Sequence, residues 1–349
     1  MMAALWLVLA IVVGDTVARP LLAAAPRPRR LATAFLAGFL VMTWATYVVA
    51  YLFRDRPSPL DDADVAVMGT AGAIAVLRGL WTLVRRGWEG RAAAAHLLAN
   101  ISRSEALDWL VLAAFAVLAG LLMGQTYWYR DGELHIAGLV WSDFGPTTAI
   151  AQSFALGSNF PTEYPHFPGL PILYHFLSSF SVGNLTRLGF DPAFANNVLS
   201  TASLVALLAL VMSLGRSVFR SPAVGRIGAA LFFVHGSLAW WPWVLRVGMG
   251  GQLPSLIWTK TDFLASGFPW RGEEWGIWTQ ATFLNQRHLA GAIAVLLVGV
   301  AFVVERYRDW HDQRAALRAL QREGRLLAEE LAGQRAIERI RGDRRPAAL

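Results

Sequence analysis

The stretch LATAFLAGFLVMTWATYVVAYLF, residues 31–53, contains no charged side chain. A helix needs about 20 mostly apolar residues to cross the roughly 30 Å hydrocarbon core of a bilayer, because each residue adds only about 1.5 Å. This stretch is long enough and apolar enough to do so. It therefore predicts a transmembrane helix and makes a membrane protein the first hypothesis for the whole chain.

The composition agrees with that hypothesis. The 349 residues are 55% hydrophobic and only 16% charged, and they include no Cys. Soluble domains have about 25% charged residues, so an ordinary soluble enzyme is excluded. The absence of Cys also excludes disulfides and every metal or redox site that depends on a thiol.

Further apolar stretches predict an all-α integral membrane protein with about seven transmembrane helices. The predicted spans are residues 3–24, 31–53, 65–84, 109–126, 194–214, 227–245 and 288–304. The first span competes with a cleaved signal peptide, but it has neither a basic start nor a clear small-x-small cleavage motif. Asp15 and Arg19 lie four residues apart in it, so they are expected to pair on one helix face.

The basic residues predict the orientation, because cytoplasmic loops of membrane proteins are enriched in Lys and Arg. Between the predicted spans, one side of the membrane collects Arg27, Arg29, Arg30, Arg85, Arg86, Arg91, Arg103, Arg216, Arg220 and Arg226. We expect this side to be cytoplasmic, with the N-terminus outside and the C-terminus inside the cytoplasmic (inner) membrane. The net charge of +7 then reflects topology, and nucleic acid is not an expected partner.

Two long segments, 127–193 and 246–287, remain outside in this topology, and both are rich in aromatic residues and Pro. Such side chains favour the membrane interface, so both segments are expected to lie on the outer leaflet. In the first, residues 146–160 predict a short interfacial helix and the Pro-rich residues 161–171 an irregular turn. Residues 172–182 then predict a second short helix.

Two groups of acidic residues in this first segment could carry chemistry. Asp143 comes just before the predicted interfacial helix, where it could be an ionised catalytic base or simply the N-cap. Asp131 and Glu133 could share a divalent cation, and the alternative is an ordinary polar turn around Gly132.

Two further groups could bind a substrate. In the run FLNQRHLAG, residues 283–291, Gln286, Arg287 and His288 form a candidate anion site, because Arg suits bidentate contact with phosphate. The alternative is that Arg287 only anchors the end of a helix. In the first segment, Tyr164, His166 and His175 are candidate substrate contacts, which interfacial polar contacts explain equally well.

The run YRDGELHIAGLVWSDFGPTTAIAQSFALGSNFPTEYPHFPGLPILYHFLSSF, residues 129–180, resembles the first outer loop of bacterial GT-C-type glycosyltransferases and their membrane relatives. The run FLNQRHLAG is similar to a second element of that group, and the two opening helices resemble the start of YYY-type membrane proteins. The resemblance covers about residues 100–305.

This resemblance implies a membrane glycosyltransferase that takes a sugar from a polyprenyl-phosphate-linked lipid donor at the outer face of the membrane. It implies that Asp143 is the catalytic base or helps to hold a divalent cation where one is used, and that Arg287 contacts the lipid phosphate. The chain differs from the family in having Thr147 where a His is frequent, and in having fewer spans. An alternative is therefore a non-catalytic, GT-C-like half that assembles with a partner membrane chain, and a third is a lipid or solute transporter.

The sequence divides into a transmembrane domain, residues 1–304, and a charged cytoplasmic tail, residues 305–349. The tail has apolar residues at helical spacing, which are Trp310, Leu317, Leu320, Leu327 and Leu331. It predicts an amphipathic helix, softly broken at Gly324 and Gly333, that lies on membrane lipid or forms a coiled coil with a partner.

Overall fold

The computed structural model describes residues 1–19, 22, 25–86, 101–138, 141–234, 245 and 278–342, most of which are helical. Within this part of the chain, five helices are long and apolar enough to cross a membrane. They are α2 (Arg27–Leu52), α3 (Pro59–Arg86, of which Pro59–Val84), α5 (Arg103–Thr126), α8 (Pro192–Phe219) and α13 (Arg287–Gly342, of which Arg287–Ile337). Two shorter apolar helices are α1 (Met2–Ala18) and α9 (Pro222–Phe233). A helical chain with several membrane-length apolar helices is thus confirmed, while seven spans remain a prediction.

Several of these helices begin at an N-cap residue, whose side chain accepts a hydrogen bond from the first turn of the helix. The side chains of Ser102, Asp191 and Ser221 each accept a hydrogen bond from a backbone N–H three residues later, at the starts of α5, α8 and α9. In α8 and α9 the next residue is Pro, which suits the first helical position because that N–H needs no intrahelical partner. These caps determine the residue at which each of the three helices begins.

Ion pairs join helix ends that the predicted topology places on the same side. At the end of α1, the Asp15 carboxylate accepts hydrogen bonds from Arg30 at 2.6 and 2.9 Å and from Arg78. The expected pair of Asp15 with Arg19 is therefore wrong. Arg30 and Arg78 come from neighbouring helices, α2 and α3, and they reach the carboxylate at the α1 terminus.

A second cluster joins three more ends on that side. Asp108, in the first turns of α5, is buried and accepts a hydrogen bond of 2.7 Å from Arg226 of α9. Arg216, near the end of α8, lies 3.5 Å from the same carboxylate. At the opposite ends of the helices, Arg187 makes two hydrogen bonds of 2.7 and 2.6 Å with Asp61. The described helices thus alternate in direction as the topology predicts.

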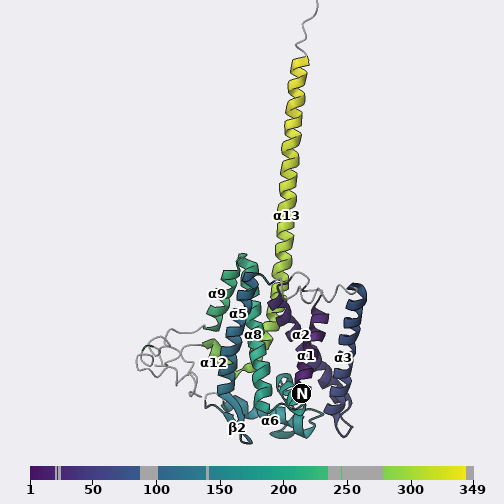
Figure 1. The fold of residues 1–349 in the computed structure, drawn as a ribbon, viewed down its shortest axis with the longest axis vertical. Helices are drawn as coiled ribbons and strands as arrows, with labels where there is room; N and C mark the ends of the chain where they lie inside the picture. Colours follow the sequence, from purple (N-terminus) through teal and green to yellow (C-terminus); the bar gives the residue numbers. More distant parts are fainter. Residues whose placement is uncertain are drawn as a thin grey trace, which may run out of the picture. The chain divides into compact units, whose positions relative to one another are not determined.

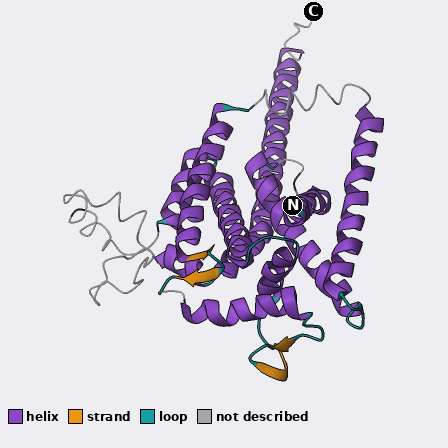
Figure 2. Cartoon of the chain, turned by 60° about the horizontal axis from the view of Figure 1, so that its bottom comes forward, coloured by secondary structure: helices purple, strands orange, loops and turns teal. Residues whose placement is uncertain are grey.

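The segment between α5 and α8 forms two small hairpins and two helices on one side of the bundle. Their bounds are β1 (Tyr127–Arg130), β2 (Glu133–Ile136), α6 (Trp141–Gly157), β3 (Glu163–Tyr164), β4 (Phe167–Pro171) and α7 (Leu177–Arg187). Figure 2 shows the strands of both hairpins in orange, and in Figure 1 α6 and β2 lie at the lower ends of α5 and α8.

This arrangement corrects three expectations. Helix α6 begins at Trp141, five residues before Pro146, so that Pro lies inside the helix and not at its start. Residues 161–171 are not irregular but contain the β3–β4 hairpin, which is tied by the Asn159 side chain to both backbone groups of Glu163. The next helix begins at Leu177 and not at residue 172, because β4 continues to Pro171.

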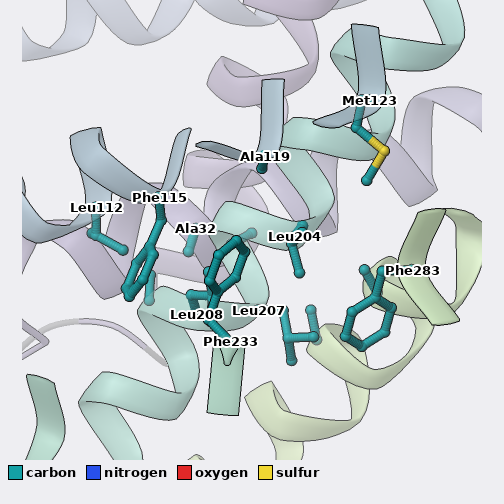
Figure 3. Close-up of a cluster of buried hydrophobic side chains, with 14 of the residues drawn as sticks. Ala32, Leu112, Phe115, Ala119, Met123, Leu204, Leu207, Leu208, Phe233 and Phe283 are labelled. Atoms are coloured by element: carbon teal, nitrogen blue, oxygen red, sulfur yellow. The ribbon is translucent and has the colours of Figure 1, made fainter. Parts of the chain in front are cut away.

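The largest core cluster is formed by α2, α5, α8 and α9, with α12 (Trp278–Asn285) and the start of α13. Figure 3 shows Phe115 and Phe233 within this cluster, and their ring centroids are 5.1 Å apart. Leu204, Leu207 and Leu208 of α8 fill the space between the surrounding helices (Figure 3). Helix α8 is thus the central helix of the described core.

The chain divides into two compact units, Met1–Gly299 and Val300–Leu349. The described part of the second unit is the remainder of α13, which continues through Gly324 and Gly333 without the expected breaks. Its large apolar side chains are exposed along the helix, and they include Trp310, Leu317, Leu320, Leu327 and Leu331. Most of the predicted outer segment 246–287 lies outside the described residues.

Candidate functional site

A cavity of about 610 Å³ lies among α2, α6, α7, α8 and the first turns of α13. This volume is in the range of small-molecule binding sites. Its polar lining comes mainly from Thr43, Tyr127, Thr147, Thr148, Gln152, Tyr174, His175, Ser178, Ser179, Asn196, Ser200, Ser203, Asn285, Arg287 and His288. Leu36 and Leu40 of α2 line it on the side of the helix end that carries Arg30, and Val295 of α13 lines it two turns after Arg287. The cavity therefore combines a polar end with an apolar wall.

The junction of α12 and α13 places Arg287 at the polar end of the cavity. The residue is only 6% exposed, and its guanidinium lies 4.7 Å from the ring centroid of Phe144. One terminal nitrogen donates to the Met123 carbonyl at 3.0 Å and to the Thr126 hydroxyl at 2.8 Å, and the other donates to the Asn197 side chain. Arg287 thus connects α13 to α5 and α8.

This geometry differs from the expected phosphate fork. The Nε atom of Arg287 also donates to a carbonyl, that of Leu284 at 3.3 Å, so all three nitrogen atoms bind the chain itself. Among the described residues no carboxylate forms an ion pair with Arg287. Four of its five N–H groups thus bind the chain itself, which leaves no pair of N–H groups for a bidentate contact with a phosphate. Its charge acts on the cavity mainly through its electric field.

Asp143 is hydrogen-bonded directly to a residue of the run FLNQRHLAG. The Nε2 atom of Gln286 donates a hydrogen bond of 2.6 Å to Oδ2 of Asp143, across 143 residues of sequence. Because α6 begins at Trp141, Asp143 lies in its first turn, so it is not the N-cap. The side chain is half-buried and does not line the cavity, although Phe144 and Thr147 beside it do. The Thr147 hydroxyl donates to the Asp143 carbonyl at 2.7 Å.

Two histidines, one from the run 129–180 and one from the run 283–291, face each other in the cavity wall. The ring centroids of His175 and His288 are 4.1 Å apart, and Tyr174 lies 3.6 Å from His175. Partial burial lowers the pKa of His175, so its neutral ring can both donate and accept a hydrogen bond at neutral pH.

The other predicted substrate residues lie apart from this cavity. Tyr164 packs against the cluster around Phe154 and Phe180, and His166 is exposed in the turn between β3 and β4. Neither residue lines the cavity. Of the six predicted substrate contacts, His175, Arg287 and His288 line the cavity, whereas Gln286 does not line it and binds Asp143 beside it.

The candidate metal residues lie in the β1–β2 hairpin. Asp131 and Gly132 both have positive φ, 54° and 86°, as a tight two-residue turn requires. The Asp131 side chain is 87% exposed and lies 3.3 Å from Arg130. Among the described residues, no three His, Asp or Glu side chains lie close enough together to hold a metal ion.

Several cavity residues did not stand out in the sequence. The Nε2 atom of Gln152 and the Oδ1 atom of Asn285 are buried without a hydrogen-bond partner, and both residues line the cavity. Gln152 follows Thr148 by one helical turn, so the helical spacing of α6 could have indicated it. Tyr127 shares a hydrogen bond of 3.0 Å with Thr148, and burial raises the pKa of its hydroxyl. Its position on a strand gave no sequence signal.

No protein-family model matches the chain, and neither does any curated protein or solved structure.

Proposed function

We propose that the chain is a membrane glycosyltransferase that transfers a sugar from a polyprenyl-phosphate-linked donor at the outer face of the cytoplasmic membrane. The observation that carries this proposal is the hydrogen bond between Gln286 and Asp143, because it joins the two separate runs that resemble GT-C-type enzymes. These runs meet beside a cavity with a polar end and an apolar wall.

The cavity suits each part of such a donor. The unpartnered amide groups of Gln152 and Asn285 can bind sugar hydroxyls, since one offers a donor and the other an acceptor. The uncompensated charge of Arg287 favours a phosphate near the polar end. Leu36, Leu40 and Val295 offer an apolar surface for the lipid chain.

Asp143 is the proposed base. It takes the proton of the acceptor hydroxyl while that oxygen bonds to the anomeric carbon of the sugar, and the bond from this carbon to the phosphate oxygen breaks. The lipid phosphate leaves with the electron pair, in the field of Arg287. Gln286 is a positioning residue, because it binds Oδ2 of Asp143 and leaves Oδ1 for the acceptor.

The test is an Asp143→Asn variant, reconstituted in vesicles with a radiolabelled polyprenyl-phosphate sugar and a panel of hydroxyl acceptors. Loss of a general base lowers the rate by about 10²–10⁴-fold, so transfer should fall by at least about 100-fold. Asp55→Asn is the matched control, because Asp55 is exposed in the turn between α2 and α3 and should retain activity. Full transfer by the Asp143→Asn variant would end the proposal.

A second candidate is a non-catalytic half that assembles with a partner membrane chain. It is favoured by Thr147, whose hydroxyl bonds to the backbone of Asp143 and offers the acid no second catalytic group. Transfer by a purified monomer would exclude this candidate. A transporter ranks third, because the charged residues Asp15, Arg30 and Arg78 pair with one another at the ends of their helices.

A further inference from the structure

A buried acid lies between α3 and α7, away from the proposed site. Asp64 of α3 and Asn184 of α7 are only 3% and 1% exposed. Nδ2 of Asn184 donates a hydrogen bond of 3.1 Å to Oδ1 of Asp64. The two remaining oxygens, Oδ2 of Asp64 and Oδ1 of Asn184, are buried without a hydrogen-bond partner.

Among the described residues, no unpaired counter-charge acts on an ionised Asp64. The charges that act on it belong to Asp61, one turn earlier on α3, and Arg187, one turn later on α7. These two form an ion pair with each other, so their effects on Asp64 largely offset. Helix α2, which packs against both α3 and α7, has no charged residue between positions 31 and 53. Helix α1 has only Asp15, which is held by arginines at the far end.

An ionised carboxylate would therefore be buried with a single hydrogen bond, which is strongly unfavourable. A proton on Oδ2 removes that charge. The proton also makes Oδ2 a hydrogen-bond donor. The side-chain amide of Asn184 has one acceptor without a partner, its Oδ1 atom, which can receive this hydrogen bond. One proton thus accounts for both unpartnered oxygens.

We propose that Asp64 retains a bound proton at neutral pH and donates it to Asn184, so that the acid and the amide close a pair of hydrogen bonds that fastens α7 to α3. This proton site does not depend on the proposed transferase activity.

The site is connected to the cavity through α7. Ser178, Ser179 and Val182 of that helix line the cavity, and the Ser181 hydroxyl shares a hydrogen bond of 3.0 Å with Thr43 of α2. A movement of α7 away from α3 would admit water to Asp64 and release the proton. Proton binding by Asp64 is therefore linked to the position of one cavity wall.

The Asp64→Asn variant tests the proposal, because an Asn side chain can make both hydrogen bonds with Asn184 without a titratable group. Asp62→Asn is the matched control: it makes the same Asp-to-Asn substitution on the same helix, at a partly exposed residue that pairs with Arg56. Two measurements are made in detergent, the infrared band of protonated carboxylic acids at neutral pH and the unfolding temperature between about pH 5 and about pH 9.

The proposal predicts a protonated-acid band in the wild type that Asp64→Asn removes and Asp62→Asn retains. It also predicts a pH effect with a definite sign. The unfolded chain releases the Asp64 proton above about pH 4 whereas the folded chain keeps it, so folding stability falls as pH rises above that value. The Asp64→Asn variant should have an unfolding temperature at least as high as that of the wild type, and this temperature should fall less steeply with rising pH. The Asp62→Asn variant should keep the pH dependence of the wild type.

Other outcomes overturn the proposal. They are a wild type without the band, equal slopes in both variants, or a failure of Asp64→Asn to fold, since this variant preserves both hydrogen bonds. An unfolding temperature that rises with sodium in the wild type and not in Asp64→Asn would assign the same oxygens to a cation instead of a proton.

Discussion

At the scale of single residues, Arg287 can be tested as an anchor. Lys keeps the charge but replaces the planar fork by one ammonium, which cannot reach Asn197, Met123 and Thr126 together. Hydrogen bonds to charged groups contribute about 1.5–3 kcal/mol each, so Arg287→Lys should lower the free energy of unfolding by at least about 2 kcal/mol. Thermal unfolding in detergent measures this change, and Arg130→Lys is the exposed control.

The same variant separates two roles of that residue. An anchor loses stability when it is replaced, with or without a substrate present. A phosphate ligand would instead leave the unfolding temperature unchanged and raise the KM for the lipid-linked donor. The second result would restore the contact that the family resemblance implies and contradict the anchoring role.

At the scale of elements, the crossing of α1 and α2 depends on two glycines. A Cβ atom added to Gly38 would lie 1.7 Å from the Ala10 carbonyl oxygen, and one added to Gly14 would lie 1.8 Å from the Ala34 carbonyl oxygen. Such backbone contact is typical of helices that associate within membranes through small residues. Gly38→Ala must push α1 and α2 apart.

We expect Gly38→Ala to cost about 1–3 kcal/mol of stability through overpacking, even though Ala favours a helix by about 1 kcal/mol over Gly. The matched control is Gly72→Ala in α3, where no atom lies within 4 Å of the new Cβ. The control should unfold at the wild-type temperature or above. Equal unfolding temperatures for the two variants would show that the α1–α2 crossing is not tight.

Elements also show how far the sequence could predict the fold. The helices over 31–53, 109–126 and 194–214 were predictable, because long uncharged runs leave few other structures for the chain. The β3–β4 hairpin was not predictable, because it depends on side-chain bonds from Asn159 that no local pattern indicates. The short helix predicted over residues 172–182 is present as α7, but it lies over Leu177–Arg187 because β4 and the residues after it occupy the start of that range.

The candidate site was predictable only in part, for a related reason. Asp143, His175, Arg287 and His288 stood out as polar residues in unusual places, and the fold brings them together. Their partners were not visible in the sequence, because the cavity wall is assembled from six helices and a strand. The buried environment of Arg287 is a tertiary property that spacing does not encode.

At the scale of the whole molecule, the last prediction concerns orientation. The Asp15 and Asp108 clusters hold six helix ends on the Arg-rich side, so the segments after α1, α3 and α8 should share one compartment. Because Arg residues are retained in the cytoplasm, a periplasmic reporter fused at residue 60 should be active and one fused at residue 95 inactive. Activity of the reporter at residue 95 would show that the orientation is the reverse of the predicted one. The cavity would then open toward the cytoplasm and transfer at the outer face would fail, whereas the proton on Asp64 would be unaffected, since it depends on packing between α3 and α7 alone.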